Sequence, residues 1–289
     1  MASRFQSIGL IGKPEDPRVS GALAALAGWL GTRVPKVLFE ETTAACCAQA
    51  GTTGLPIDEL ARRVDLAIVL GGDGTLLHCA RAMLATDVPL VGVNLGRLGF
   101  LAEISAGDMQ TSLERILDGE FLEERRSILA CEIEHEGHAV SRADAFNDVV
   151  VHKWGTARMI ELETTIGGRF LNRQRADGLI VSTPTGSTAY ALSGGGPILE
   201  PQLDATLLVP ICPHTLSNRP LVVSGDEPIE ITVADAMANT ARVTCDGQTG
   251  FEVPTGARVR VVRKRERVRL LHLPEYDYFS VLRAKLRWG

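Results

Sequence analysis

A glycine-rich pentapeptide directly behind a buried strand is the part of this chain best suited to chemistry. Gly71-Gly72-Asp73-Gly74-Thr75 follows the apolar run 65–70 and precedes a segment, 76–84, with apolar residues near helical spacing. Glycines let the backbone approach an anion, and a helix start presents unpaired N–H groups and a positive dipole end. The loop is therefore predicted to hold phosphate groups. Because a carboxylate repels phosphates, Asp73 indicates a metal ligand or a base.

Two better-known glycine loops do not fit this sequence. It has no GxxxxGK[ST] motif, which argues against a P-loop, and GxGxxG fails at Leu77, where a third glycine should allow close helix packing. The alternative that the pentapeptide leaves open is an ordinary glycine-rich turn with an exposed aspartate, since short motifs are weak on their own.

A second polar segment follows another buried strand. Residues 175–197 pass from a strand into a turn dense in Ser, Thr and Gly, whose hydroxyls need partners if they are buried. Such a segment suits a purine nucleoside, with Tyr190 against the base and Thr188 and Ser193 hydrogen-bonded to its edges. The alternative is that residues 185–188 simply cap a short helix at 189–192.

A third segment places an amide and a carboxylate before an apolar strand. Asn147 and Asp148 precede the run 149–151. Adjacent Asn and Asp usually mark a turn. Next to a nucleotide, however, a carboxylate can accept hydrogen bonds from ribose hydroxyls, as acidic residues do in dinucleotide-binding folds. The functional hypothesis therefore depends on the three segments occurring together.

The first third of the chain alternates between strand and helix patterns, which predicts an α/β domain with a parallel sheet. The expected strands are 7–12, 37–39, 66–70 and 89–93, and the expected helices are 19–30, 57–63 and 76–84. Parallel sheets bind ligands beyond the carboxyl ends of their strands. We therefore expect the loop 71–75 and a second glycine loop, 94–100, to face one crevice.

After a helix at 108–117 the pattern changes to short alternating strands, such as 228–233, 241–245 and 258–261. This predicts a mainly antiparallel β domain. Helical spacing returns at 278–286, and we expect this tail to pack back on the first domain. The predicted domains are 1–122, an α/β domain carrying the GGDGT loop, 123–274, rich in β structure, and 275–289, the returning tail.

Composition narrows the classes of protein. At 289 residues the chain is long enough for two domains, and 45% hydrophobic and 22% charged residues are ordinary for a globular protein. The net charge of −5 does not favour a nucleic-acid partner. The basic residues that do cluster alternate with valines and are interpreted as the solvated face of a hairpin: Arg258, Arg260, Arg263, Lys264, Arg265, Arg267 and Arg269.

The six cysteines show no CxxC pair and no metal-ligand spacing, which is typical of reduced thiols in a cytosolic protein. The N-terminus lacks the apolar region of a signal peptide, and the long charge-free stretch 178–199 is rich in Gly, Pro, Ser and Thr. We therefore expect a cytoplasmic protein with no membrane-spanning segment.

The three segments occur in the order seen in NAD kinases, and the chain resembles that family from its first strand to its end. The resemblance includes GGDGT, the Asn-Asp pair, Asp-Gly-Leu-Ile-Val-Ser-Thr-Pro-Thr-Gly-Ser-Thr-Ala-Tyr at 177–190, the segments 93–101 and 213–220, Asp246-Gly247-Gln248 and the closing 282–289. GGDGT alone is shared with diacylglycerol, sphingosine and 6-phosphofructo kinases. The Thr-Pro-Thr-Gly-Ser-Thr-Ala-Tyr segment is much more specific.

The resemblance implies the roles of individual residues. It makes Asp73 the proton acceptor and places the phosphate donor on Gly71, Gly72, Gly74 and Thr75. It also implies a set of residues that contact NAD: Asp73, Gly74, His78, Asn147, Asp148, Arg158, Arg175, Asp177, Thr188, Ala189, Tyr190, Ala191, Leu192, Ser193 and Gln248. Many relatives have Glu where Asp148 stands, so the reach of that carboxylate is shorter here.

The implied reaction transfers the terminal phosphate of ATP to the 2'-hydroxyl of the adenosine ribose of NAD, giving NADP. Arg175 favours ATP as donor, because relatives that use inorganic polyphosphate tend to have a small residue there. A divalent cation, Mg²⁺, is expected to arrive with ATP, since the sequence shows no dedicated ligand cluster. The resemblance further implies a homotetramer in which the β domains form the interface and a neighbouring subunit completes each site.

The sequence gives less support to two rival functions. A lipid kinase of the same superfamily should show an apolar cavity-lining segment or a basic membrane patch, and neither is evident in the sequence. A non-catalytic NAD(P) sensor would keep the binding loops, but the intact Asp73 argues against it.

Overall fold

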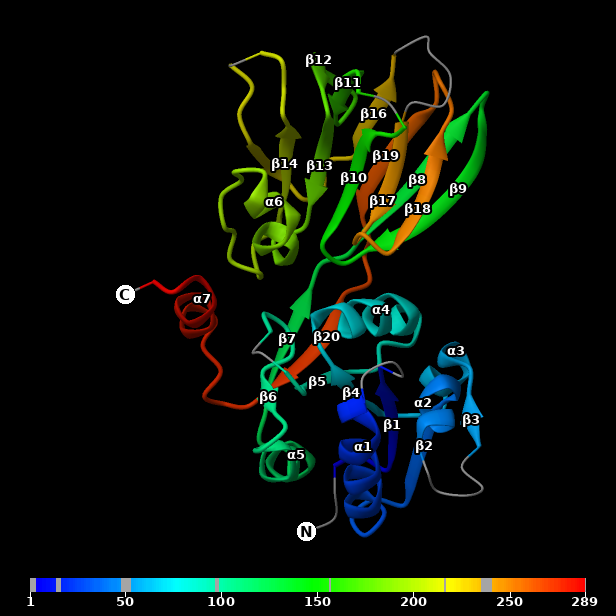
Figure 1. Cartoon of the computed structure of the whole chain (residues 1–289), viewed down its shortest axis with the longest axis vertical. Helices are drawn as coiled ribbons and strands as arrows, with labels where there is room; N and C mark the ends of the chain where they lie inside the picture. The colour runs from blue at the N-terminus through cyan, green and yellow to red at the C-terminus, as the bar shows by residue number, and fades with distance from the viewer. Residues whose placement is uncertain are drawn as a thin grey trace. The chain divides into compact units, whose positions relative to one another are not determined.

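The computed structural model describes residues 4–13, 17–47, 53–96, 99–155, 157–215, 217–234 and 241–288. The chain divides into two compact units, residues 1–125 with 268–289, and residues 126–267 (Figure 1). Unit 1 is an α/β unit and unit 2 is almost entirely β, as the sequence predicts. The chain returns to unit 1 at Val268, earlier than the predicted boundary at 275, because one strand precedes the C-terminal helix.

Unit 1 contains a mainly parallel sheet in the order β3-β2-β1-β4-β5-β20-β7. Its strands are β1 (Ser7–Gly12), β2 (Lys36–Glu40), β3 (Gly54–Leu55), β4 (Leu66–Gly71), β5 (Leu90–Asn94), β7 (Leu122–Arg126) and β20 (Val268–His272), with β6 (Ile104–Ser105) paired beside β5. Its helices are α1 (Pro17–Leu30), α2 (Glu41–Cys46), α3 (Ile57–Ala61), α4 (Asp73–Met83), α5 (Met109–Leu117) and α7 (Tyr278–Leu286), with a 3₁₀ turn η1 (Leu84–Thr86).

The order of the parallel strands places the glycine loop at a particular point of the sheet. The chain moves outward from β1 to β2 and β3, then returns to pair β4 with the other side of β1 and continues to β5. The strand order therefore reverses between β1 and β4. In open parallel sheets ligands bind outside the carboxyl ends of the strands at such a reversal. Asp73 lies there, immediately after β4.

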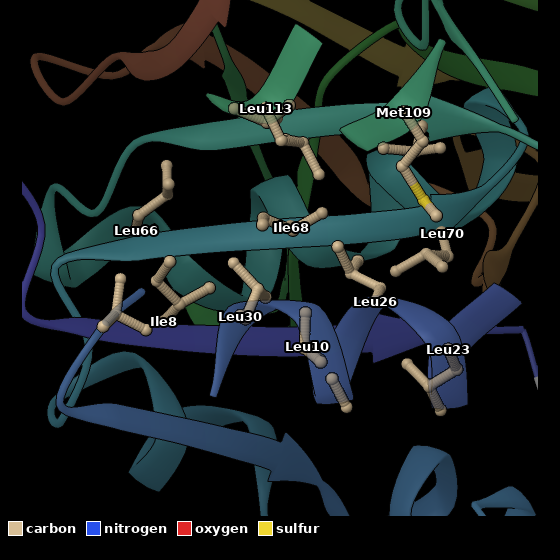
Figure 2. Close-up of a cluster of buried hydrophobic side chains, with 14 of the residues drawn as sticks. Ile8, Leu10, Leu23, Leu26, Leu30, Leu66, Ile68, Leu70, Met109 and Leu113 are labelled. Carbon is tan, nitrogen blue, oxygen red and sulfur yellow. The ribbon is translucent and has the colours of Figure 1, made fainter. Parts of the chain in front are cut away.

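One apolar cluster holds this sheet to α1 and α5. Figure 2 shows Leu23, Leu26 and Leu30 of α1 lying against the side chains of β1 and β4, with Met109 and Leu113 of α5 in the same cluster. All six residues of β4 are buried. Burying an apolar side chain of this size contributes about 1.5–3 kcal/mol, so the strand that ends at the glycine loop is firmly anchored.

Unit 2 consists of two antiparallel six-stranded sheets, in the orders β15-β14-β13-β10-β17-β18 and β12-β11-β16-β19-β8-β9. The strands are β8 (Leu129–His135), β9 (His138–Ala145), β10 (Asp148–Lys153), β11 (Ile160–Ile166), β12 (Arg169–Ala176), β13 (Gly178–Ser182), β14 (Ala205–Ile211), β15 (Leu221–Ser224), β16 (Ile229–Val233), β17 (Ala241–Cys245), β18 (Thr249–Val253) and β19 (Arg258–Arg263). Alternate residues of both sheets form one buried cluster, which makes this unit a sandwich.

Three strands of the first sheet, β10, β13 and β14, are buried on their outer face as well. Leu179 and Val181 of β13 belong to the core between the sheets, whereas Ile180 packs with Ala191 and Leu199 on the other side. The segment that covers this outer face contains a 3₁₀ turn η2 (Thr185–Thr188) and a short helix α6 (Tyr190–Ser193). The polar segment singled out in the sequence is thus held on β13 by its own apolar residues.

The predicted basic hairpin at 258–269 is wrong. Arg258 to Arg263 lie in β19 of unit 2, whereas Arg269 lies in β20, which pairs with β5 of unit 1. Six of the seven basic residues are also engaged in ion pairs rather than facing only solvent. Arg263, 11% exposed, pairs with Asp204 and Asp226, and Arg269 pairs with Glu123. Alternation identified two strands here but could not show that they belong to different sheets.

Candidate active site

Asp73 is the first residue of α4 and therefore lies at the positive end of a helix dipole. Buried β4 precedes it, and α4 is held to the unit by the buried side chains of Leu76, Leu77, Cys79, Ala80 and Met83. The side chain of Asp73 is half-buried. Its position is thus determined by an apolar strand on one side and an anchored helix on the other.

The carboxylate of Asp73 is held by the second glycine loop. Its Oδ2 accepts a hydrogen bond from the backbone N–H of Phe100 at 2.8 Å, and its Oδ1 accepts from those of Leu101 and Ala102 at 3.0 and 3.2 Å. As the parallel sheet predicts, the two loops meet, although residues 97 and 98 lie outside the described residues. Hydrogen bonds to a charged group contribute about 1.5–3 kcal/mol each, so this contact is substantial.

Gly99 is the residue that makes room for this carboxylate. A Cβ at this position would lie 2.1 Å from Asp73 Oδ1 and 2.9 Å from its Cγ. The turn is closed by a hydrogen bond from the N–H of Gly99 to the carbonyl oxygen of Ala102, 3.3 Å. We call residues 99–102, with their three N–H donors, the carboxylate turn. Sequence reasoning placed Gly99 in the second glycine loop, 94–100, but did not predict its contact with Asp73.

The rest of the predicted donor loop surrounds Asp73. Gly71 ends β4 and is buried, Gly72 and Gly74 are exposed, and Thr75 is half-buried in the first turn of α4. His78 is exposed on the same helix. The exposed backbone at the start of an eleven-residue helix can bind an anion. These positions suit the predicted contacts with phosphate groups.

In unit 2, Asn147 and Asp148 lie where a turn enters β10. The carboxylate of Asp246 fastens this turn: it accepts hydrogen bonds from the backbone N–H groups of Phe146, Asn147 and Asp148 at 3.0, 2.7 and 3.2 Å. Asp246 itself has a left-handed φ of 53° and is followed by Gly247 in the turn between β17 and β18. Aspartate tolerates that conformation. An Asp-Gly pair between alternating strands was the available signal for this residue.

Asp148 is buried beside that second carboxylate. Asp148 is only 4% exposed. Burial, together with the nearby charge of Asp246, raises the pKa of Asp148 to about 7, and a backbone interaction with Tyr190 acts in the opposite direction. The group is therefore poised to change its charge near neutral pH. The Tyr190 interaction also joins this turn to the polar segment 183–193.

The buried hydroxyls of the polar segment have backbone partners. Thr183 Oγ1 donates to the carbonyl of Phe146 at 2.7 Å, and Ser187 Oγ donates to that of Pro184 at 2.6 Å. A Cβ at Gly186 would lie 2.1 Å from the carbonyl oxygen of Asn147, so this glycine lets the segment approach the turn at 147. These hydroxyls hold the segment together, but they do not cap α6, which receives no side-chain cap hydrogen bond, so the capping alternative is wrong.

Other side chains of the segment remain accessible to a ligand. Tyr190 is 47% exposed at the start of α6, and Ser193 is exposed at its end. Thr188 is half-buried and donates to the carbonyl of Thr185 at 3.2 Å. Ala189 and Leu192 are half-buried, whereas Ala191 is buried in the cluster under α6. Of the predicted adenine contacts, Tyr190 and Ser193 are thus accessible to a ligand, whereas buried Ala191 holds the segment in place.

The remaining predicted NAD residues fall into two groups along β10. Gln248 is exposed in the turn that contains Asp246, at the end where Asp148 pairs with Ser182. Asp177 lies at the other end, where its Oδ1 is 2.7 Å from Lys153 Nζ. Five steps along a strand separate these two ends by roughly 17 Å. One chain therefore does not gather all predicted residues at one point.

The two other residues of the distant group are exposed. Arg175 lies on β12, two residues before Asp177, and its carbonyl accepts a hydrogen bond from the N–H of His214 at 2.9 Å. Arg158 lies between β10 and β11. Basic side chains of this kind suit phosphate or carboxylate groups of a ligand. They belong to unit 2, as do Asn147 and Asp148, while Asp73 belongs to unit 1.

Three further features bear on the predicted class. Among the described residues, no group of three or more His, Cys, Asp or Glu side chains is arranged to hold a metal ion. No described helix is long and apolar enough to span a membrane. The six cysteines all lie within the described ranges, and they form no disulfide.

Comparison with known families gives a match in each half of the chain. Residues 8–121 match the ATP-NAD kinase N-terminal domain, and residues 146–273 match the ATP-NAD kinase C-terminal domain. The chain is similar to the NAD kinase of Nitrosococcus oceani, at 47% identity over 100% of this chain and 99% of the relative. It is also similar to that of Methylococcus capsulatus, at 49% identity with the same coverage.

Solved structures agree in fold. The yeast NADH kinase complexed with NADH matches with a TM-score of 0.89 and 27% identity, over 98% of this chain and 88% of that one. An NAD kinase from Archaeoglobus fulgidus in complex with ATP matches with a TM-score of 0.72 and 27% identity, over 98% of this chain and 100% of that one.

Proposed function

The chain belongs to the NAD kinase family, and on that basis we propose that it transfers the terminal phosphate of ATP to the 2'-hydroxyl of the adenosine ribose of NAD, giving NADP. The observation that carries this proposal is the position of Asp73. Its carboxylate lies at the first residue of α4, at the reversal of strand order, and is oriented by three backbone N–H groups.

We assign Asp73 the role of general base. An ionised carboxylate offers about four lone-pair positions, and the carboxylate turn takes two on Oδ1 and one on Oδ2. Oδ2 thus keeps the capacity to accept a proton from an alcohol while the turn holds the side chain in place. Phosphoryl transfer depends mainly on positioning and charge neutralisation, so an oriented base suits the reaction.

The phosphate donor is assigned to the exposed backbone around Gly72 and Gly74. The start of α4 attracts the negative charge of a triphosphate. We propose that Mg²⁺ enters as part of the substrate MgATP, because a cation that bridges donor phosphates needs few protein ligands. The relative from Archaeoglobus fulgidus was solved in complex with ATP, which supports this choice of donor.

NAD is assigned to the region around Asp148. Ionised Asp148 can accept hydrogen bonds from ribose hydroxyls, Asn147 can donate to them, and the exposed ring of Tyr190 can stack on adenine. The interaction of Asp148 with the backbone of Tyr190 keeps these groups together. The yeast relative was solved with NADH, so NADH should be assayed beside NAD as acceptor.

We propose that a neighbouring subunit supplies the distant group, Arg158, Arg175 and Asp177. The group lies roughly 17 Å along β10 from Asp148, as estimated from the rise of a strand. A homotetramer built through the β units would let two subunits contribute different ends of their sheets to one dinucleotide. Cytoplasmic location is proposed with it, in line with six thiols that form no disulfide.

Exposed apolar residues on two edge strands support an interface between copies. Phe170 and Leu171 of β12 are 64% and 40% exposed, and Leu221 and Val222 of β15 are 37% and 43% exposed. Several of these residues line a hollow of about 530 Å³ in unit 2. Edge strands with apolar side chains readily pair with another chain. Light scattering on the wild type and on Phe170→Lys tests this: smaller particles in the variant support the interface.

The activity is tested by incubating the purified protein with ATP, MgCl₂ and NAD. NADP is then measured with an NADP-specific dehydrogenase, and parallel reactions replace NAD with NADH. Formation of NADP that stops in Asp73→Asn supports the proposal. A folded protein that binds NAD but forms no product with any donor would instead be the non-catalytic sensor.

The shared site is tested by subunit complementation. Asp73→Asn and Asp177→Ala should each be nearly inactive alone, because each lacks one contribution to every site. Co-expressed with different affinity tags and purified through both tags, mixed oligomers should regain partial activity at sites that combine the two intact contributions. Mixed oligomers that stay inactive would place Asp177 and Asp73 in the same subunit's site.

A further inference from the structure

A buried histidine in unit 1 is not used by the proposed reaction. His272, the last residue of β20, is 2% exposed. Its ring is stacked on that of Tyr276, with centroids 3.9 Å apart and an interplanar angle of 11°. A buried imidazole normally needs partners on both nitrogens, and here both partners are acidic.

The two acidic partners come from different elements. Nδ1 of His272 lies 3.0 Å from Oε1 of Glu103, in the segment before β6, and Nε2 lies 3.3 Å from Oε2 of Glu124 on β7. Only the Glu103 contact has hydrogen-bond geometry. Burial lowers the pKa of His272, but the two carboxylates outweigh it and the pKa is raised. Two carboxylates beside one imidazole favour its protonated form, which burial alone would disfavour.

Glu103 connects this cluster to the proposed catalytic base. It directly follows Ala102, the last residue of the carboxylate turn, whose N–H donates to Asp73 Oδ1. The backbone of Ala102 also lies close to β5, since a Cβ on Gly92 would be 2.8 Å from its Cα. After Glu103, the chain pairs with β5 as β6. The turn is thus fixed to β5 on one side and to β20 by Glu103 on the other.

We propose that His272 is a positioning residue for Asp73, acting by holding Glu103 and thereby the carboxylate turn that orients the base. The inference rests on the proposed function of Asp73. Glu124 contacts the same imidazole but belongs to β7, which is not part of the turn. This gives a matched pair of partners, of which only one is continuous with the turn.

The first experiment compares Glu103→Ala with Glu124→Ala. Each variant leaves His272 with one carboxylate, and the two side chains are similarly shielded, at 19% and 12% exposed. We expect Glu103→Ala to lower kcat by about tenfold to a hundredfold, as small misplacements of catalytic groups do, with KM for NAD and ATP unchanged. Glu124→Ala should keep a near-normal kcat. Equal losses, or no loss in either variant, would overturn the proposal.

The second experiment replaces His272 and remains informative if a glutamate variant fails to fold. The amide of His272→Asn reaches the place of Nδ1 and can still donate to Glu103, whereas that of His272→Gln reaches the place of Nε2. His272→Asn should therefore have a higher kcat than His272→Gln. The two variants should unfold at similar temperatures when followed by circular dichroism. Equal kcat in both variants contradicts positioning. Asp73→Asn is measured alongside these variants. If Asp73→Asn retains activity, the assignment of Asp73 as the base fails; if it loses activity while the Asn and Gln variants of His272 have equal kcat, only the positioning role of His272 fails.

Discussion

Asp73 and Asp148 are both carboxylates placed at strand ends, yet their surroundings differ in kind. Asp73 is half-buried and accepts hydrogen bonds from three backbone N–H groups. Asp148 is 4% exposed and lies near a second carboxylate, Asp246, which has itself taken three N–H donors of the turn at 146–148. Asp73 is oriented by hydrogen-bond donors, whereas burial and a neighbouring negative charge disfavour the ionised form of Asp148.

This difference teaches that a strand-end aspartate can serve two purposes. A carboxylate with several fixed donors is held in one geometry, which suits a base that must meet an alcohol. A buried carboxylate with a raised pKa changes its protonation within the working range of pH and couples binding to that change. Four substitutions separate these roles.

The largest effect is expected for Asp73→Asn. Removing a positioned base lowers kcat by about 10² to 10⁴. One N–H of the carboxylate turn would then face an amide NH₂, at a cost to stability of about 1–3 kcal/mol. Initial rates of NADP formation and urea unfolding measure the two effects. A variant with near-normal kcat would show that Asp73 is only the anchor of the turn.

Gly99→Ala should have the next largest effect. The new Cβ would overlap Asp73 Oδ1, so the carboxylate must leave its three donors. We expect kcat to fall by about tenfold to a hundredfold, with the Kd for NAD unchanged in calorimetry. Gly107→Ala is the control, because its Cβ would meet only Ser105 Oγ, at 3.6 Å. Full activity in Gly99→Ala would mean that Asp73 works outside the turn.

Asp148→Asn should change stability in a pH-dependent way. The pKa of Asp148 is about 7 in the folded protein against an ordinary 3.8. At pH values between these two pKa values, Asp148 carries a proton in the folded state but has lost it in the unfolded state. The free energy of unfolding of the wild type therefore falls as pH rises. The Asn variant should be more stable than wild type at pH 8 by up to about 4 kcal/mol, and the gain should shrink toward pH 5.

Urea unfolding at pH 5, 6, 7 and 8 measures this difference, and NAD binding at the same pH values measures its functional side. Wild-type affinity for NAD should rise as Asp148 ionises through pH 7, while Asp148→Asn should show a flat profile. Asp246→Asn is the companion variant. It removes the neighbouring charge, so Asp148 should ionise, and NAD affinity should rise, at lower pH in this variant than in the wild type. A stability gain independent of pH would contradict the raised pKa.

The smallest effect is expected for Tyr190→Ala. The ring is 47% exposed, so its removal should leave thermal unfolding nearly unchanged. Loss of one stacking contact of about 1 kcal/mol should raise KM for NAD roughly three- to tenfold. Tyr190→Phe keeps the stacking face and should behave as wild type. Equal KM values in all three proteins would remove Tyr190 from the adenine site.

Local sequence patterns were sufficient for the two fold classes and for the elements that carry the candidate site. Buried β4, the helix after Gly71–Thr75 and the polar segment after β13 all follow from apolar spacing and glycine content. The family resemblance carried by GGDGT and the segment 177–190 was equally available in the sequence, because it depends on residue types in order.

Contacts between distant segments could be read only from the tertiary structure. Asp73 meets residues 100–102, Asp246 meets 146–148 and His272 meets Glu103. Periodicity reports which side of a strand is buried but not which strand lies beside it, and for that reason β19 and β20 were taken for one hairpin. The sequence by itself determined the elements and their chemistry; tertiary pairing determined which carboxylate is given donors and which is left beside another charge.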